Sequence, residues 1–255
     1  MIKKRIIPKI LVDASSEGSQ VLAFSSIQYK SFKRIGSPLS QLRILESNMV
    51  DELSIINLGR RLIPLEFSNF IENTLRHLNS PVTAGGNLNN FEQMGSLIRA
   101  GADKVISSFS TSKTDLFKEF IKFFGSQSLV ISLDYEISPD NYFVLRNETI
   151  QRTESNFLEI VTKLNFLKIG ELVLNDITRD GMGIGVDIST LDKVRKVSDF
   201  PIVSSSGVGK AEDFIDAFHN GADGVSAGSF FATMDQNPLQ VRSRIFNSGI
   251  PVRPH

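Results

Sequence analysis

Short apolar runs rich in β-branched residues alternate with longer amphipathic segments along the whole chain. This alternation is typical of parallel strands joined by helices rather than of hairpins. The eight predicted strands span Arg5–Val12, Glu52–Asn57, Pro81–Ala84, Lys104–Ser107, Leu129–Asp134, Glu171–Ile177, Ile202–Ser205 and Gly224–Ala227. The eight predicted helices span Ser37–Met49, Phe67–Leu78, Asn90–Arg99, Thr114–Phe124, Glu154–Phe166, Ser189–Val197, Lys210–Asn220 and Leu239–Ser248.

Eight such units in 255 residues predict a closed (β/α)8 barrel, the TIM barrel, with an open doubly wound sheet as the alternative. An internal repeat favours the barrel. Pro81 matches Pro201, and Gly101-Ala102-Asp103 matches Gly221-Ala222-Asp223, both at an offset of 120 residues. We therefore expect two half-barrel repeats. Because no linker or charge block interrupts the middle of the chain, we expect residues 1–255 to form a single domain.

Composition excludes several classes of function. The chain has 28 basic and 28 acidic residues, so it has no net charge that would attract nucleic acid or an anionic membrane. It has no cysteine and only three scattered histidines, so we expect no metal site and no cofactor. Pro8 and Lys9 interrupt the apolar start of the chain, and no segment is long enough for a membrane span. We expect a cytoplasmic protein.

Glycine-rich loops follow the predicted strands six, seven and eight, at Asp180-Gly181, Ser206-Gly207-Val208-Gly209 and Gly228-Ser229. Ligands of a (β/α)8 barrel bind at the C-terminal ends of its strands. Glycine lets backbone N–H groups approach an oxyanion without a Cβ atom in the way. The loops therefore predict a phosphate site, although each glycine could serve only a tight turn. Its residues are Asp180, Gly181, Gly207, Gly228 and Ser229.

The opposite half of the barrel repeats this pattern, with Gly85-Gly86-Asn87 after the third strand and Ser107-Ser108 after the fourth. Gly86, Asn87 and Ser108 are therefore candidates for a second phosphate site. Phe109 takes the position of Ser229 there and would crowd an anion. Two sites across the mouth would suit an elongated bisphosphate.

Asp134 is the clearest candidate for acid–base catalysis, because it ends an apolar strand and would present its carboxylate at the mouth. Asp180 is a second candidate. Strand alternation places Asp13 on the same inward face as Arg5 and Lys9, although Asp13 could equally be a loop carboxylate.

Charged residues begin four of the predicted strands, at Arg5, Glu52, Lys104 and Glu171. Inward-facing charges at the bottom of a barrel are costly unless they are paired. Two acids and two bases can neutralise one another, so we expect a ring of salt bridges at this end.

Six segments carry a resemblance to a known family. They are Lys4-Arg5-Ile6-Ile7, Asp51-Glu52-Leu53, Gly101-Ala102-Asp103-Lys104-Val105, Phe124-Gly125-Ser126-Gln127, Arg179-Asp180-Gly181 and Gly249-Ile250-Pro251-Val252-Arg253. Through them the chain resembles the cyclase subunit of imidazole glycerol phosphate synthase over nearly its whole length. The resemblance implies a barrel that receives ammonia from a glutaminase docked at its bottom and uses it at the top. It also implies that Arg5, Glu52, Lys104 and Glu171 form the ammonia gate.

The top of the barrel departs from that family. The family uses two aspartates, of which Asp134 matches the second, whereas Leu11 occupies the position of the first. Asp13 would have to replace it from roughly 6–7 Å farther along the strand. Lys9 also stands where the family has a small or apolar residue. In these departures the chain resembles the paralogues of the family that accompany amidotransferase-like enzymes in surface-glycan biosynthesis.

Three hypotheses follow. The leading one is an ammonia-conducting subunit, paired with a glutaminase, that supplies nitrogen for an acetamidino sugar of a surface glycan such as lipopolysaccharide. The second is a true cyclase, a lyase of histidine biosynthesis, with Asp134 and Asp13 as its catalytic residues. The third is a non-catalytic scaffold that binds phosphate and a partner protein.

Overall fold

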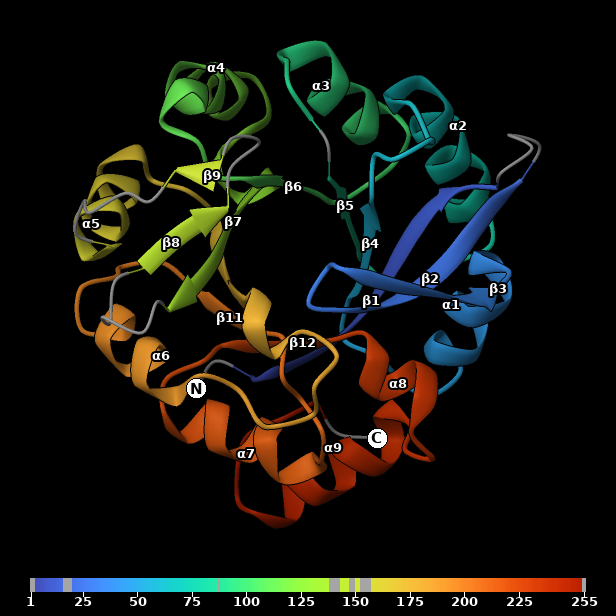
Figure 1. The fold of residues 1–255 in the computed structure, drawn as a ribbon, viewed down its shortest axis with the longest axis vertical. Coiled ribbons are helices and arrows are strands. Elements are labelled where there is room, and N and C mark those ends of the chain that lie inside the picture. Colours follow the sequence, from blue (N-terminus) through green and yellow to red (C-terminus); the bar gives the residue numbers. More distant parts are fainter. Residues whose placement is uncertain are drawn as a thin grey trace.

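Eight parallel strands close into a barrel in the computed structural model, which describes residues 3–15, 20–86, 88–137, 143–146, 150–151 and 157–253. Around the barrel, the strands follow the order β1 (Arg5–Ala14), β4 (Leu53–Asn57), β5 (Val82–Gly85), β6 (Lys104–Ser108), β7 (Leu129–Ile137), β10 (Glu171–Asp176), β11 (Ile202–Ser205) and β12 (Gly224–Ala227). Strand β12 pairs in parallel with β1, so the sheet closes (Figure 1). This closure confirms the predicted (β/α)8 barrel and excludes the open sheet.

Helices surround the barrel in a ring (Figure 1). They are α1 (Pro38–Glu46), α2 (Pro64–Leu75), α3 (Phe91–Arg99), α4 (Thr114–Phe124), α5 (Phe157–Leu167), α6 (Ile188–Arg195), α7 (Ala211–His219), α8 (Ser229–Thr233) and α9 (Pro238–Asn247), with short 3-10 turns at Thr111–Lys113, Ser126–Ser128 and Ile177–Arg179. The short helix α8 was not predicted. Helix α2 begins three residues before the predicted Phe67, because Pro64 occupies its first turn and Glu66 accepts a hydrogen bond from the Ile63 N–H.

The apolar core has two parts, as the alternation of side chains along barrel strands requires. The larger part lies between strands and helices and includes Ile6, Val105 and Leu172. The smaller part fills the barrel interior with Ile7, Ile106, Val130, Val173 and Val203. The strands therefore bury one face against helices and the other inside the barrel.

Two antiparallel hairpins depart from the prediction of parallel units alone. They are β2 (Val21–Ile27) with β3 (Ser31–Gly36), and β8 (Phe143–Arg146) with β9 (Ile150–Gln151). The turn between β2 and β3 has positive φ at Gln28 and Tyr29, both 52°, without the glycine or asparagine that usually marks such turns. The sequence therefore gave no turn signal. In Figure 1 this hairpin extends toward the barrel axis.

The repeated segments occupy equivalent places in the two halves of the barrel. Strands β5 and β6 lie in the first half, and β11 and β12 lie four units later in the second.

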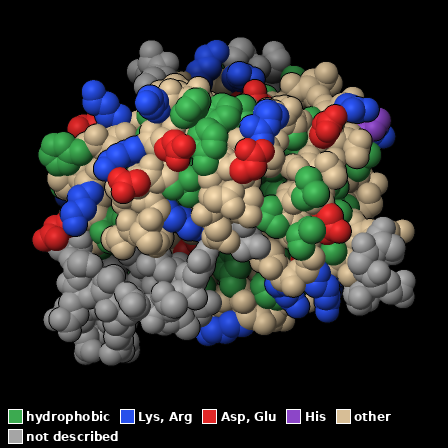
Figure 2. Space-filling view, turned by 90° about the horizontal axis from the view of Figure 1, so that it is seen from above, with side chains coloured by type: hydrophobic (Ala, Val, Ile, Leu, Met, Phe, Trp, Pro, Cys, Tyr) green, Lys and Arg blue, Asp and Glu red, His purple; other side chains and the backbone are tan. Residues whose placement is uncertain are grey.

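Figure 2 shows acidic and basic side chains interspersed over one side of the molecule. Among the described helices, none combines the length and apolarity needed to cross a membrane.

Candidate functional site

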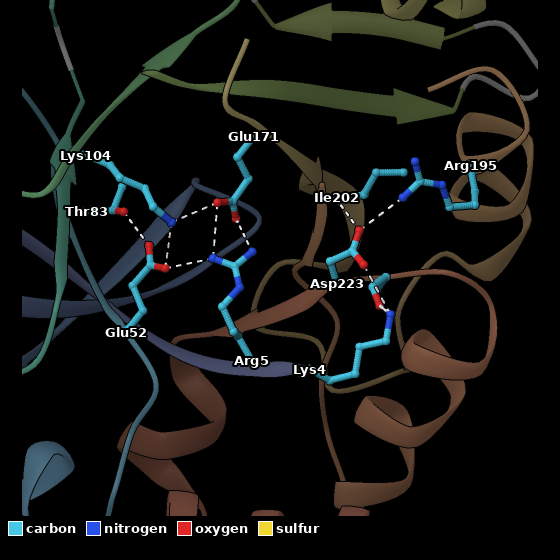
Figure 3. A network of polar contacts seen from close by, with 10 residues as sticks. Lys4, Arg5, Glu52, Thr83, Lys104, Glu171, Arg195, Ile202 and Asp223 are labelled. Atoms are coloured by element: carbon cyan, nitrogen blue, oxygen red, sulfur yellow. Dashed lines mark hydrogen bonds and ion pairs between the residues drawn. The ribbon is translucent and has the colours of Figure 1, made fainter. Parts of the chain in front are cut away.

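A ring of four charged side chains lies at the N-terminal end of the barrel (Figure 3). Arg5 donates to Glu52 Oε2 at 2.8 Å and to Glu171 Oε1 at 2.9 Å. Lys104 Nζ lies 2.8 Å from Glu52 Oε2 and 2.9 Å from Glu171 Oε2. The Thr83 hydroxyl donates to the other oxygen of Glu52 at 2.5 Å. The structure thus brings together all four predicted ring residues.

Mutual attraction outweighs the cost of burying these charges. Burial disfavours the ionised form of Glu52, but Lys104 and Arg5 beside it lower its pKa below the ordinary value. Burial likewise disfavours the charged form of Arg5, whereas Glu171 and Glu52 raise its pKa. The pKa shifts of Glu52 and Arg5 therefore both favour the charged form. A separate cluster of Lys4, Arg195 and Asp223, also drawn in Figure 3, ties the starts of β1, β11 and β12 together.

A cavity of about 230 Å³ extends from the charged ring to the mouth of the barrel. Its lower end touches Glu52, Thr83 and Glu171. Its middle is apolar and is lined by Ile7, Ile56, Ile106, Val130, Val173 and Val203. Its upper end is polar and is lined by Lys9, Tyr29, Asn57, Ser108, Ser132, Asp134, Asn175, Ser205 and Ser226, among others. An apolar middle disfavours ions and accepts small neutral molecules.

Asp134 ends the inward face of β7 and lines the upper part of this cavity. Its Oδ1 accepts hydrogen bonds from Ser132 and from Asn175, each at 2.8 Å, and its Oδ2 accepts one from Ser108 at 3.1 Å. Ser206 fixes the Asn175 amide in turn, by donating to its Oδ1 at 2.6 Å. The carboxylate is therefore held in one orientation at the mouth, as acid–base chemistry requires.

Asp13 does not line the cavity, contrary to the alternation argument. Its Oδ1 accepts hydrogen bonds from the backbone N–H groups of Arg61 and Leu62 at 2.9 Å, and Arg60 lies 4.0 Å from Oδ2. Asp13 is 1% exposed, and its carboxylate fixes the loop after β4. The pairing of β1 with its barrel neighbour β4 ends at Val12, whereas β1 continues to Ala14 in its pairing with β2. Asp13 therefore lies beyond the barrel, where alternation no longer places it inside. Asp13 therefore has the loop role that the sequence left open.

The five residues of the predicted phosphate site surround one small cavity beside the mouth, together with Lys9 and Ser206. We call this group the cradle: Asp180, Gly181, Gly207, Gly228 and Ser229. Gly181 has a φ of +71°, and a Cβ atom there would lie 2.1 Å from the carbonyl oxygen of Ser26. Only glycine allows this approach of the β2–β3 hairpin. The Ser26 hydroxyl also donates to Asp180 at 2.5 Å.

The predicted second phosphate site is only partly brought together. Gly86 and Ser108 both line the central cavity, whereas Asn87 lies outside the described residues. Phe109 is buried in the outer core between strands and helices, so it does not occupy the cavity as the repeat suggested.

Tyr29 is a residue of the mouth that the sequence did not reveal, because it arrives from the unpredicted hairpin. Its hydroxyl lies 3.5 Å from Lys9 Nζ and closes part of the upper cavity. Ser132 was also missed, although its position two residues before Asp134 places both on the same face of one strand.

In the described ranges, no three histidine, aspartate or glutamate side chains are grouped so that they could hold a metal ion.

The fold and site define a class: a closed (β/α)8 barrel whose interior cavity connects a charged ring to an acidic mouth, with a glycine cradle beside that mouth. A family model described as histidine biosynthesis protein matches residues 5–236, and the chain belongs to this family.

Full-length relatives agree with this assignment. The chain is 33% identical, over 99% of both chains, to the protein of Prochlorococcus marinus (strain MIT 9313) named imidazole glycerol phosphate synthase subunit hisF2. It is 32% identical to imidazole glycerol phosphate synthase subunit HisF of Staphylococcus saprophyticus, over 99% of this chain and 100% of the relative. It is 29% identical to the subunit of the same name in Petrotoga mobilis, with the same coverage.

Proposed function

We propose that this chain is the ammonia-using subunit of a synthase of the imidazole glycerol phosphate synthase type. In this proposal a glutaminase docks at the N-terminal end of the barrel, and a phosphorylated acceptor binds at the mouth. The observation that carries the proposal is the cavity, which touches Glu52 and Glu171 at one end and Asp134 at the other.

Each part of the chain then has a chemical task. The charged ring admits ammonia when its salt bridges separate. The apolar middle of the cavity favours neutral ammonia over ammonium, because an ion would lose its hydration there. Asp134 moves a proton at the mouth, where Ser108, Ser132 and Asn175 orient its carboxylate. The cradle binds the phosphate of the acceptor.

One candidate acceptor is the ribulosyl formimino bisphosphate of histidine biosynthesis, which would make the chain a cyclase. The names of the full-length relatives favour this candidate. Gly86 and Ser108, across the mouth from the cradle, supply part of a second phosphate site for a bisphosphate.

The other candidate acceptor is a sugar of a surface glycan, whose acetamido group would become an acetamidino group. Two features of the mouth favour it. Leu11 has no proton to exchange, and Asp13 is held by the loop after β4 outside the cavity. Lys9 adds a cation to the upper cavity. Both features change the acid–base groups available to the reaction.

The first experiment measures turnover of the ribulosyl formimino bisphosphate by the purified chain with excess ammonium, which replaces the glutaminase. Product formation that is lost in Asp134→Asn would establish the cyclase. No turnover by folded protein would contradict the cyclase and direct the assay to acetamido sugars. No turnover of either acceptor would favour a scaffold.

A second experiment tests the ammonia path itself, with the chain and its glutaminase together. We expect Lys104→Met to change glutamine-dependent turnover relative to ammonia-dependent turnover, because it removes one cation of the ring. Lys196→Met is the control, since Lys196 pairs with Asp192 on the outer surface of α6. An unchanged ratio in Lys104→Met would contradict the gate.

A further inference from the structure

Lys9 occupies the junction between the central cavity and the cradle. The residue lines both spaces. The lysine stem passes directly over Gly228, where a Cβ atom would lie 3.6 Å from Lys9 Cε. A Cβ atom at position 228 would therefore be in van der Waals contact with the lysine stem.

The ammonium group of Lys9 has only neutral hydrogen-bond partners in the described part of the chain. Nζ lies 3.2 Å from Ser205 Oγ and 3.5 Å from the Tyr29 hydroxyl. A lysine ammonium has three N–H donors, so these hydroxyls leave one for another acceptor. No described carboxylate forms an ion pair with Lys9, although Asp134 and Asp180 also face this region.

The ammonium nevertheless stays charged. Burial would lower the pKa of Lys9, but Tyr29, Asp180 and Asp134 around it raise the pKa above its ordinary value. The protein therefore holds a positive charge beside the cradle, and an anionic ligand there could accept a charge-assisted hydrogen bond from it.

We propose that Lys9 is the anion-binding side chain of the cradle, and that its ammonium contacts an oxygen of the acceptor's phosphate held there. The inference rests on the proposed function, since it assigns a ligand contact in the same mouth. The backbone at Gly181, Gly207 and Gly228 would surround the phosphate closely, and Lys9 would place a positive charge beside it. The phosphate oxygen would accept a hydrogen bond from the third N–H of Lys9, which the two hydroxyls do not use.

The experiment measures the affinity of the purified chain for inorganic phosphate by calorimetry at low salt. In Lys9→Met, which keeps the stem and removes the charge, we expect phosphate to bind about 10- to 100-fold more weakly, as expected for a lost charge-assisted hydrogen bond. In the control Lys196→Met, we expect a change of less than about twofold, because an exposed ion pair contributes little. Equal affinity in Lys9→Met and the unaltered protein would overturn the proposal.

A second measurement on the unaltered protein does not depend on how Lys9→Met folds. The ¹⁵Nζ resonance of Lys9, assigned by its loss in Lys9→Arg, should shift as phosphate is added. A resonance that stays fixed while phosphate saturates the protein would contradict the contact, and so would a protein that binds no phosphate.

These readouts are separate from the proposed function. Lys9-dependent phosphate binding without any ammonia-driven turnover would support the contact and contradict the synthase. Turnover with phosphate binding that is independent of Lys9 would support the synthase and overturn the contact alone.

Discussion

Replacing Glu52 by glutamine tests whether the charged ring is held together by its charges. Glu52 is buried and accepts hydrogen bonds from Arg5, Lys104 and Thr83. In Glu52→Gln the amide oxygen can still accept from Arg5 and Lys104, and the amide nitrogen can donate to the Thr83 hydroxyl. The negative charge is lost, however, and two cations then face Glu171 alone.

The expected cost follows from this imbalance. Removing one partner of a buried ion pair typically lowers the free energy of unfolding by about 3–5 kcal/mol. For a protein of this size, that loss corresponds to a decrease in melting temperature of roughly 6–20 °C. The double variant Glu52→Gln/Lys104→Met should recover part of the loss, since one cation, Arg5, then faces one carboxylate, Glu171.

Urea unfolding between pH 7 and pH 3 is the assay. The pKa of Glu52 is lowered in the folded state below its ordinary value of 4.5. Its stabilising contribution is therefore complete above the unfolded pKa and is lost as pH falls through the folded pKa. The difference in unfolding free energy between the unaltered protein and Glu52→Gln should stay constant down to about pH 5 and narrow below 4.5.

The control is Glu72→Gln, because Glu72 pairs with Arg76 on the exposed surface of α2. It should cost less than about 1 kcal/mol. A cost in Glu52→Gln as small as that of this control would show that the charges do not hold the ring together. A double variant with the simple sum of the two single losses would show the same, since the charges would then be uncoupled.

Three further predictions concern the mouth. Asp134→Asn should lower ammonia-driven turnover by about 100-fold or more with little change in melting temperature; a small loss of turnover would exclude Asp134 as the acid–base group. Asp13→Asn should lower the unfolding free energy, measured in urea, by about 1–2 kcal/mol, because it weakens the hydrogen bonds to the loop after β4. A loss of turnover per folded molecule would instead place Asp13 in the reaction. Gly181→Ala should lower the melting temperature and weaken phosphate binding, because its Cβ would meet the Ser26 carbonyl; normal values of both would contradict the strain argument.

The barrel and its charged ring could be predicted because both depend on local, periodic signals. Each strand is a short apolar run, and each helix carries an amphipathic stripe. Arg5, Glu52, Lys104 and Glu171 lie at the starts of predicted strands, so their meeting at one end followed once the barrel was inferred. The cradle was predictable for the same reason, since its glycines follow successive strands.

The mouth was less predictable because it depends on segments that leave the repeat. The β2–β3 hairpin has no glycine or asparagine at its turn, so nothing indicated that Tyr29 would reach Lys9. The pairing of β1 with β2 also carries the end of β1 out of the barrel. Asp13 consequently serves a loop, although simple alternation placed it inside.

The sequence by itself determined the class of fold, the ring residues and the strand ends where we expect ligands to bind, because hydrophobic periodicity and strand order fix these without reference to distant contacts. Only the tertiary structure decided which mouth side chains share one space. Lys9, Tyr29 and Ser205 come from three separate strands or turns. Their distances depend on how the barrel closes and how the hairpin folds over it, and no local pattern encodes that geometry.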